Sequence, residues 1–311
     1  MPKRIAWVFP GQGSQKVGMG RSWADRYAES AAVFAEADAA LGLPLSALCF
    51  DGPEEALQLT ANTQPAILAA SAAMLAAVRR ASPEPVAVAG HSLGEYTAHV
   101  AAGTLPLADA LRLVRRRGEL MQEAVPVGVG AMAALLGLAP EAVEEVVREA
   151  AAGEVCAVAN RNSPEQVVIA GHRGAVERAM ALARERGAKR ALPLPVSAPF
   201  HCPLMAPARA GLAPDLAAAP FSAPRFPVVT NIDAEPVATG EAARDALVRQ
   251  VDGPVRWVEV VRQLVEGLGV EAIVEIGPGA VLTGLVRRIA PQAEAISIQE
   301  PEALARLEAL A

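Results

Sequence analysis

Short apolar runs alternate with helical patterns along most of this 311-residue chain. Five runs are continuous rather than alternating in polarity, and they cover residues 5–9, 85–89, 166–170, 226–230 and 272–276. Continuous apolar strands are buried on both faces, as in a parallel sheet that helices cover from both sides. The pattern therefore predicts an α/β protein whose main sheet is parallel.

The middle of the chain follows a different order of elements. Strand patterns occur at 131–136, 155–159, 167–170 and 189–196, and helical patterns occur at 140–151 and 174–187. The order β-α-β-β-α-β is that of a ferredoxin-like unit. We therefore predict a small subdomain at 125–197, inserted into a large domain that consists of 1–124 and 198–311. Nine prolines within 193–227 exclude central strands from that stretch and allow one short or kinked helix.

The longest apolar run, 66–78, is rich in alanine and ends at Arg79. It is shorter than the ~18–20 residues that a membrane span requires, so we expect a buried helix and no membrane partner. The apolar run at 5–10 is likewise shorter than the ~7–15 residues of a signal-peptide core. We therefore expect a cytoplasmic protein.

Composition and charge narrow the classes of function. Apolar residues make up 52% of the chain and charged residues 20%, which is typical of a globular protein. The net charge of −6 is opposite to the basic field that nucleic-acid phosphates require, so we expect no nucleic-acid partner. The three cysteines, Cys49, Cys156 and Cys202, are widely spaced and fit neither a disulfide framework nor a metal site.

Two glycine-rich patterns follow the first predicted strand, but neither matches a nucleotide-binding motif. After 11–15, a dinucleotide fingerprint would need glycine at position 16, where Lys16 stands. Residues 13–18 have the P-loop spacing, but Met19 replaces the required lysine. We therefore expect no bound cofactor, although the loop presents backbone N–H groups where ligands of open α/β sheets bind.

The strongest chemical signal is GHSLG at 90–94. It follows an apolar strand and precedes a helical pattern that runs to about Gly103, which is the context of a nucleophile elbow. The glycines permit a sharp turn that exposes the Ser92 hydroxyl, and the next helix presents N–H groups to developing negative charge. We interpret Ser92 as a nucleophile. The alternative is an ordinary strand-to-helix turn with a capping serine.

A serine nucleophile needs a base, and the chain has four histidines. His91 adjoins Ser92, so its side chain is expected to diverge, and His99 lies about two turns down the following helix. His172 falls in the inserted unit. His201 lies at the proline-bounded return to the large domain, so we predict that it is the base, with a plain loop histidine as the alternative.

Arg117 lies on the apolar face of a predicted helix at 107–125. Its neighbours at three and four residues' distance are Leu113, Val114, Leu120 and Met121. A guanidinium on such a face is unfavourable unless an anion meets it. The residues alone leave two alternatives, which are a pair with an internal carboxylate and a bidentate pair with a substrate carboxylate.

Several longer stretches resemble malonyl-CoA:acyl carrier protein transacylases. They are FPGQGSQ (9–15), GHSLGEY (90–96), RRGELMQEAVP (116–126), GAMAALLG (130–137), NSPEQVVIAG (162–171), HCPLM after Phe200, Gln250, GPVRW (253–257) and EIGPG (275–279). The similarity runs from residue 5 to about 290 and preserves order and spacing. It implies an α/β-hydrolase-like large domain with a mainly parallel sheet and an inserted ferredoxin-like subdomain.

The resemblance also implies roles for individual residues. Ser92 would be the acylated nucleophile, and His201 would be the base that later serves as the acid. A backbone carbonyl of Gln250 would orient the imidazole in place of a triad carboxylate. The N–H groups of Gln12 and Leu93 would form the oxyanion hole.

The substrate-binding residues implied by the resemblance are Arg117, Phe200 and Met121. Arg117 would hold the malonyl carboxylate. A phenylalanine just before the histidine accompanies malonyl specificity in related acyltransferase domains, whereas many bacterial stand-alone enzymes have a smaller residue there. The expected reaction moves malonyl from malonyl-CoA to the pantetheine thiol of acyl carrier protein, for fatty acid biosynthesis, in a monomer without a cofactor or metal.

Two alternative functions share these residues. A serine esterase or thioesterase would use the same elbow and hydrolyse its substrate, whereas a non-catalytic docking module for acyl carrier protein would not need Ser92. Acyl carrier proteins are acidic, so docking on this acidic chain would need a local basic patch. Basic residues of the inserted unit are candidates, with a solvated helix face as the alternative. They are Arg178, Arg184, Arg186, Lys189 and Arg190.

Overall fold

The main sheet of the computed structural model has six strands in the order β10-β9-β1-β2-β7-β8. They are β1 Ile5–Phe9, β2 Ala87–Gly90, β7 Val228–Val229, β8 Pro236–Val237, β9 Ala272–Ile276 and β10 Glu294–Ile298. All neighbours pair in parallel except β7 and β8, which are antiparallel. The predicted α/β class with a mainly parallel sheet is therefore confirmed. The structure describes residues 3–310, so residues 1–2 and 311 of the predicted large domain lie outside it.

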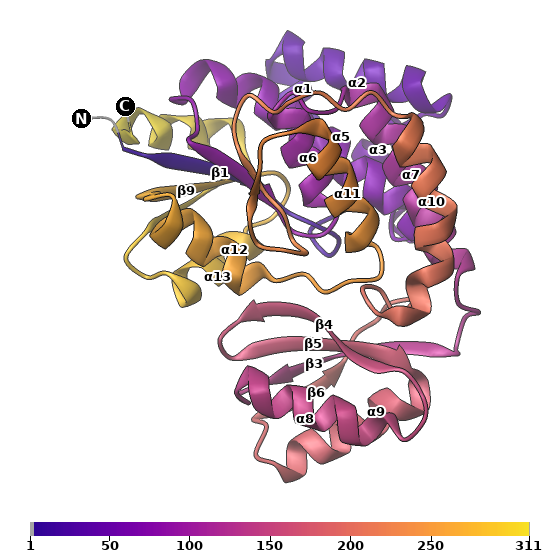
Figure 1. Cartoon of the computed structure of the whole chain (residues 1–311). Helices are drawn as coiled ribbons and strands as arrows, with labels where there is room; N and C mark the ends of the chain where they lie inside the picture. The colour runs from indigo at the N-terminus through magenta and orange to yellow at the C-terminus, as the bar shows by residue number, and fades with distance from the viewer. Residues whose placement is uncertain (1–2, 311) are drawn as a thin grey trace.

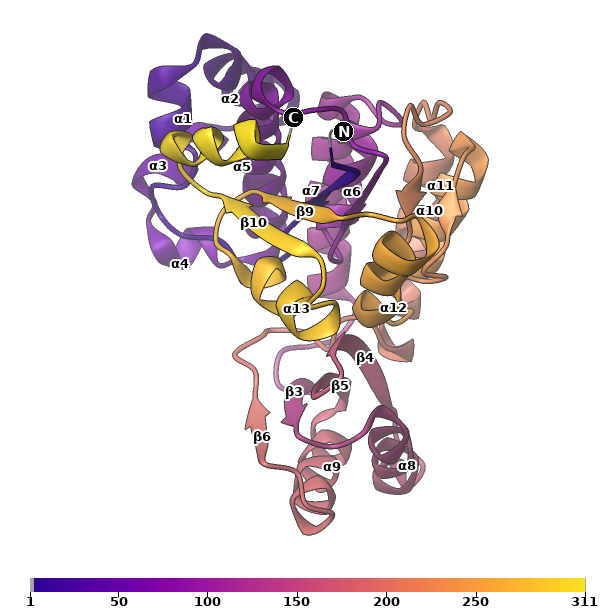
Figure 2. The ribbon, with the colours of Figure 1, turned by 90° about the vertical axis from the view of Figure 1, so that its left-hand side faces the viewer.

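Helices cover both faces of this sheet (Figures 1 and 2). In β1, Trp7 and Phe9 share a buried cluster with α5 and α6, whereas Ala6 and Val8 share another with α12 and α13. This two-sided burial explains why the strands are continuously apolar. The helices are α1 Arg21–Arg26, α2 Ala28–Leu41, α3 Leu45–Asp51, α4 Glu54–Leu57, α5 Thr60–Ala81, α6 Gly94–Ala101, α7 Leu107–Glu123, α10 Ala206–Ala218, α11 Gly240–Gln250, α12 Trp257–Arg262 and α13 Val281–Ile289. Shorter turns are η1 Pro203–Met205, η2 Gln263–Gly267 and η3 Pro301–Leu310.

Helix α5 is longer than the run at 66–78 from which it was predicted. It spans 22 residues, and by length and composition alone it would be long and apolar enough to cross a membrane. However, 83% of its most apolar window is buried inside the protein. The helix therefore belongs to the core, as predicted, and its first turn adds the polar residues Thr60, Thr63 and Gln64, which are also buried.

A second sheet lies in the middle of the chain, within a part that we call the small unit (130–193). Its strands follow the order β4-β5-β3-β6 and all neighbours are antiparallel. One face packs against two helices, and the other packs towards the rest of the chain (Figures 1 and 2). The elements are β3 Gly130–Leu136, α8 Pro140–Ala151, β4 Cys156–Ser163, β5 Gln166–His172, α9 Arg173–Glu185 and β6 Arg190–Pro193.

The two predicted irregular regions behave differently. The proline-rich stretch holds one regular α-helix, α10, which contains Pro214, and β6 ends where that stretch begins. The strand expected at 226–230 shrinks to two residues, because Pro227 has no N–H with which to extend the ladder. The chain thus returns from the small unit through an irregular segment, and this segment carries His201.

Candidate active site

A sharp turn between β2 and α6 presents Ser92. Its φ of 52° lies in the left-handed region, which is strained for a residue with a side chain. A Cβ at Gly90 would lie 2.0 Å from the backbone carbon of Gly94, and one at Gly94 would lie 2.1 Å from the Phe9 oxygen. Both glycines are therefore needed for the helix to start so close to the sheet, which gives the GHSLG pattern a physical cause.

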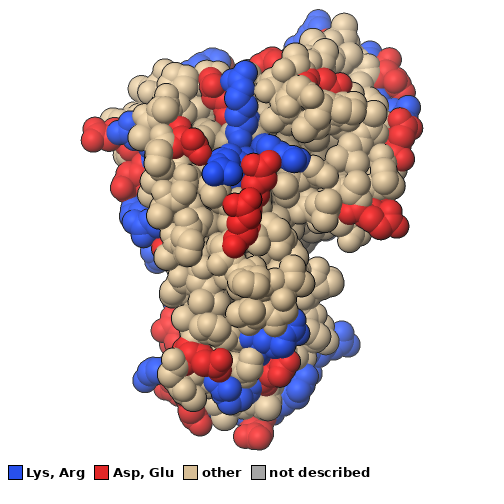
Figure 3. Space-filling view, turned by 90° about the vertical axis from the view of Figure 1, so that its right-hand side faces the viewer, with Lys and Arg blue, Asp and Glu red and all other residues tan. Residues whose placement is uncertain are grey.

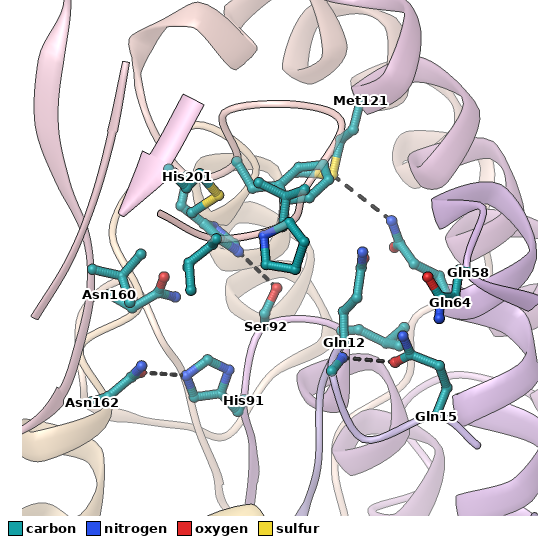
Figure 4. A pocket seen from close by; sticks show the side chains of 18 of the residues that line it. Gln12, Gln15, Gln58, Gln64, His91, Ser92, Met121, Asn160, Asn162 and His201 are labelled. Carbon is teal, nitrogen blue, oxygen red and sulfur yellow. Dashed lines mark hydrogen bonds between the residues drawn. The ribbon is translucent and has the colours of Figure 1, made fainter. Parts of the chain in front are cut away.

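Ser92 and His201 form a hydrogen-bonded pair. Ser92 Oγ lies 2.7 Å from His201 Nε2, and the two side chains point towards each other (Figure 4). His201 Nδ1 faces two backbone carbonyl oxygens, those of Gln250 at 3.0 Å and Gly253 at 3.2 Å. These carbonyls can only accept, so Nδ1 carries the proton and Nε2 is left free to accept the serine proton.

The environment keeps this imidazole neutral. Burial, and to a smaller extent the charge of Arg117, lower the pKa of His201 to about 3. No carboxylate contacts the ring among the residues that the structure describes, so the orienting partners are uncharged. The pair can therefore remove a proton from Ser92 at neutral pH, but the resulting imidazolium is not stabilised by a neighbouring anion.

Arg117 is almost fully buried beside the same hydroxyl. Its Nη1 donates to Gln64 Oε1 at 2.7 Å, and its Nη2 donates to Gln250 Oε1 at 3.0 Å and to Ser92 Oγ at 3.3 Å. Burial lowers its pKa. Within the described part of the chain none of these partners is a carboxylate, which removes the alternative of an internal ion pair.

A cavity of about 400 Å³ connects these groups. It lies between the two sheets, and β3, β4 and β5 of the small unit supply one wall (Figure 4). Seven of the eight predicted site residues line it, namely Gln12, Ser92, Leu93, Arg117, Met121, Phe200 and His201. The eighth, Gln250, lies behind the wall and reaches the site through its backbone oxygen and its side chain.

The loop after β1 packs directly against the elbow. A Cβ at Gly11 would lie 2.4 Å from the His91 oxygen, so only glycine allows this approach. Gln12 is anchored through its side-chain oxygen, which accepts a hydrogen bond from Thr60 Oγ1 at 2.9 Å. The backbone N–H groups of Gln12 and Leu93 donate no hydrogen bond within residues 3–310, so both are available to an anion in the cavity.

The other histidines are engaged elsewhere. His91 also borders the cavity, but its Nε2 lies 2.8 Å from Asn162 Oδ1 and its ring turns away from Ser92 (Figure 4). His99 is buried in α6, and His172 Nδ1 accepts from the Val155 N–H in the small unit. The predicted elimination of these three histidines as the base of Ser92 agrees with the geometry.

Comparison with known proteins gives the family. An acyl transferase domain model matches residues 6–302. The malonyl CoA-acyl carrier protein transacylase of Escherichia coli (strain K12) is 52% identical over 303 residues, which cover 97% of this chain and 98% of the relative. This chain belongs to the malonyl CoA-acyl carrier protein transacylase family.

Solved structures agree with this assignment to the transacylase family. An acyl carrier protein S-malonyltransferase from Vibrio cholerae superposes with a TM-score of 0.95 at 50% identity, over 98% of this chain and 99% of that one. A malonyl-transacylase solved in complex with its type II polyketide acyl-carrier protein gives a TM-score of 0.95 at 47% identity, over 98% and 99% of the two chains.

Three buried polar residues near the site of this transacylase-family chain escaped the sequence analysis. Gln64 accepts from Arg117, Glu95 accepts from Gln250 Nε2 at 2.8 Å, and Asn231 accepts from the Ser92 N–H at 2.6 Å. Asn231 follows β7, at the end of a parallel strand where α/β sites gather, and this position was the available signal. Burial raises the pKa of Glu95 to about 7, against the opposing effect of its hydrogen bonds.

The basic residues of the small unit are largely paired within it. Arg178 binds Glu154 at 2.7 Å, Arg186 binds Glu149, and Lys189 lies 3.9 Å from Glu165. On the face shown in Figure 3, blue and red side chains are interspersed over the small unit rather than segregated. These contacts favour the solvated-face interpretation for the three residues over a basic docking patch.

Proposed function

We propose that this protein transfers a malonyl group from malonyl-CoA to the pantetheine thiol of acyl carrier protein, through a malonyl ester on Ser92. The observation that carries the proposal is one hydroxyl with two partners: Ser92 Oγ lies 2.7 Å from a neutral imidazole and 3.3 Å from a buried guanidinium. The imidazole activates the nucleophile. The guanidinium lies where the carboxylate of a malonyl group on Ser92 would reach it.

The first half-reaction acylates Ser92. His201 Nε2 takes the hydroxyl proton as Ser92 Oγ attacks the thioester carbonyl of malonyl-CoA. The oxyanion accepts hydrogen bonds from the N–H groups of Gln12 and Leu93. As the tetrahedral intermediate collapses, the C–S bond breaks, and the coenzyme A thiolate leaves with the proton from His201.

The second half-reaction reverses these steps with another thiol. His201 Nε2 removes the proton from the pantetheine thiol of acyl carrier protein, and the thiolate attacks the malonyl ester. Collapse breaks the bond to Ser92 Oγ, which recovers the proton from His201. The backbone oxygen of Gln250 keeps Nδ1 protonated in both halves, so the same ring serves as base and as acid.

The malonyl group itself is held by three side chains in this proposal. Arg117 pairs with its carboxylate in bidentate fashion, and this pair takes the place of an internal ion pair that Arg117 lacks. Phe200 and Met121 contact its carbon atoms. Phe200 is 9% exposed and limits the room beside His201, which favours malonyl over branched acyl groups.

We infer an α/β-hydrolase-like large domain (1–124 and 198–311) and a ferredoxin-like subdomain (125–197). The elbow between a parallel strand and α6 supports the first. The second is supported by the order β4-β5-β3-β6, in which the first and third strands of the unit are central and two helices cover one face. We place the protein in cytoplasmic fatty acid biosynthesis, acting as a monomer.

Mass spectrometry of the intact protein after brief exposure to malonyl-CoA tests the function. We expect one malonyl adduct, mapped to Ser92 and discharged by acyl carrier protein, and no adduct on Ser92→Ala. A serine thioesterase would instead release free malonate at the same rate with and without acceptor. A docking module would show no adduct on the native chain.

A further inference from the structure

Three fully buried polar side chains from separate elements meet behind the elbow. They are Glu95 in α6, Asn231 in the loop after β7, and Gln250 at the end of α11, and each is 0% exposed. The reaction described above uses only the backbone oxygen of Gln250. The side chains of all three are therefore unexplained, although burying polar groups is unfavourable unless they are hydrogen-bonded.

Asn231 holds the backbone of the elbow on both sides of the strained residue. Its Oδ1 accepts from the Ser92 N–H at 2.6 Å, and its Nδ2 donates to the Gly90 carbonyl at 2.7 Å. Both backbone groups belong to the sharp turn, where regular secondary structure does not supply partners. The amide of Asn231 therefore fixes the orientation of the peptide that carries the nucleophile.

Gln250 connects the elbow to both partners of Ser92 Oγ. Its Nε2 donates to the Ser92 carbonyl at 3.0 Å, and its Oε1 accepts from Arg117 Nη2 at 3.0 Å. Its backbone oxygen faces His201 Nδ1, also at 3.0 Å. A shift of this one residue would move the base, the arginine and the elbow relative to one another.

Glu95 joins the two amide-bearing residues. Its Oε2 accepts from the Asn231 backbone N–H and from Gln250 Nε2, each at 2.8 Å. Its other oxygen, Oε1, lies 4.0 Å from His99 Nε2 and takes no hydrogen bond among the described residues. Glu95 thus acts through Oε2, as a double acceptor that sets the position of Asn231 and the rotamer of Gln250.

We propose that Asn231 and Glu95 are positioning residues for acyl transfer: Asn231 fixes the elbow, and Glu95 fixes Asn231 and Gln250. Ser92 Oγ then stays within reach of both His201 and Arg117. Neither positioning residue lines the cavity, so neither touches the acyl group or coenzyme A. This inference rests on the proposed function, because it concerns the geometry of malonyl transfer to Ser92.

Rapid-quench acylation of the full chain by malonyl-CoA tests the proposal. Asn231→Leu keeps the side-chain volume but removes both hydrogen bonds to the elbow. We expect its maximal acylation rate to fall about 10²-fold, because displacements of about 1 Å have effects of that size. The malonyl-CoA concentration at half-maximal rate should stay within about twofold, since no binding contact is lost.

The Glu95 variants separate the acceptor from the carboxyl group. Glu95→Gln keeps a double-acceptor oxygen, and because burial raises the pKa of Glu95 to about 7, a neutral amide is a close substitute. We expect Glu95→Gln to acylate within about threefold of the native chain, whereas Glu95→Ala should be about 10²-fold slower. Equal rates for these two variants would overturn the acceptor role.

A matched control separates positioning from general destabilisation. Val286→Ala removes buried apolar volume from α13, on the other face of the sheet, and should lower Tm without slowing acylation. The proposal fails if Val286→Ala is as slow as Asn231→Leu, or if Asn231→Leu acylates at the native rate. Should Asn231→Leu not fold, Asn231→Ala and the Glu95 pair carry the same test. A native chain that forms no adduct would refute the proposed function as well, whereas an active native chain with fast variants would refute only this inference.

Discussion

Replacing Arg117 should change which acyl group the protein accepts. In Arg117→Ala the guanidinium that lies 3.3 Å from Ser92 Oγ is lost, and a malonyl carboxylate bound there would lose a bidentate partner. An acetyl group has no carboxylate, so its transfer should depend far less on Arg117. The predicted effect is therefore a loss of selectivity rather than a uniform loss of activity.

The magnitude follows from the number of charge-assisted bonds. Each hydrogen bond to a charged group contributes about 1.5–3 kcal/mol, so a bidentate pair contributes about 3–6 kcal/mol. At about 1.36 kcal/mol per tenfold change in rate, malonyl transfer should slow by about 10²–10⁴-fold. Acetyl transfer should slow by about tenfold or less, because only the contact with Ser92 Oγ is lost.

Quenched intact-mass measurements of acylation by malonyl-CoA and by acetyl-CoA provide the assay. Arg117→Lys serves as the control, because it keeps the positive charge but cannot form the planar two-bond pair. We expect it to fall between the native protein and Arg117→Ala for malonyl transfer. Equal losses for malonyl and acetyl transfer in Arg117→Ala would show that Arg117 stabilises the site rather than binding the carboxylate.

Three further predictions follow from the geometry. Because the pKa of His201 is lowered to about 3, the neutral base should persist well below pH 6, so kcat/KM for malonyl-CoA should show no inflection near the ordinary histidine value of about 6.5; an inflection there would contradict the assigned environment. Gly94→Ala should lower the free energy of unfolding in urea by about 1–3 kcal/mol, because its Cβ would lie 2.1 Å from a β1 carbonyl oxygen. Gly284→Ala is the control, since it has open space in α13 and should be neutral or gain about 0.5–1 kcal/mol. Phe200→Ser should raise the ratio of methylmalonyl to malonyl acylation by about tenfold, since one methyl group is worth about 1–3 kcal/mol in a tight pocket; an unchanged ratio would place the size limit elsewhere.

The elements that local pattern determines were predictable. The strands at 5–9 and 272–276 match β1 and β9 residue for residue, because burial on both faces leaves a continuous apolar run. Helix α5 was underestimated because its buried first turn is polar: Gln64 is 1% exposed yet hydrogen-bonded to Arg117. Hydropathy records side-chain chemistry, whereas burial of these residues depends on partners that are distant in sequence.

The same distinction explains which site residues could be found. Ser92 has a local signature, and Arg117 was identified by its place on an apolar face. Asn231 lies 139 residues from the serine it holds, and no spacing rule connects the two positions. The partners of Arg117 were equally hidden, because both are amides, which carry no charge pattern along the sequence.

The uncharged partners of His201 bear on the choice of acceptor. With two carbonyls instead of a carboxylate at Nδ1, the ring has a low affinity for a proton, so it readily activates only acceptors that are themselves acidic. A thiol releases its proton about 10⁷ times more readily than water, since their pKa values are about 8.5 and about 15.7. The loaded serine ester is thereby protected against hydrolysis while it remains reactive towards a sulfhydryl acceptor.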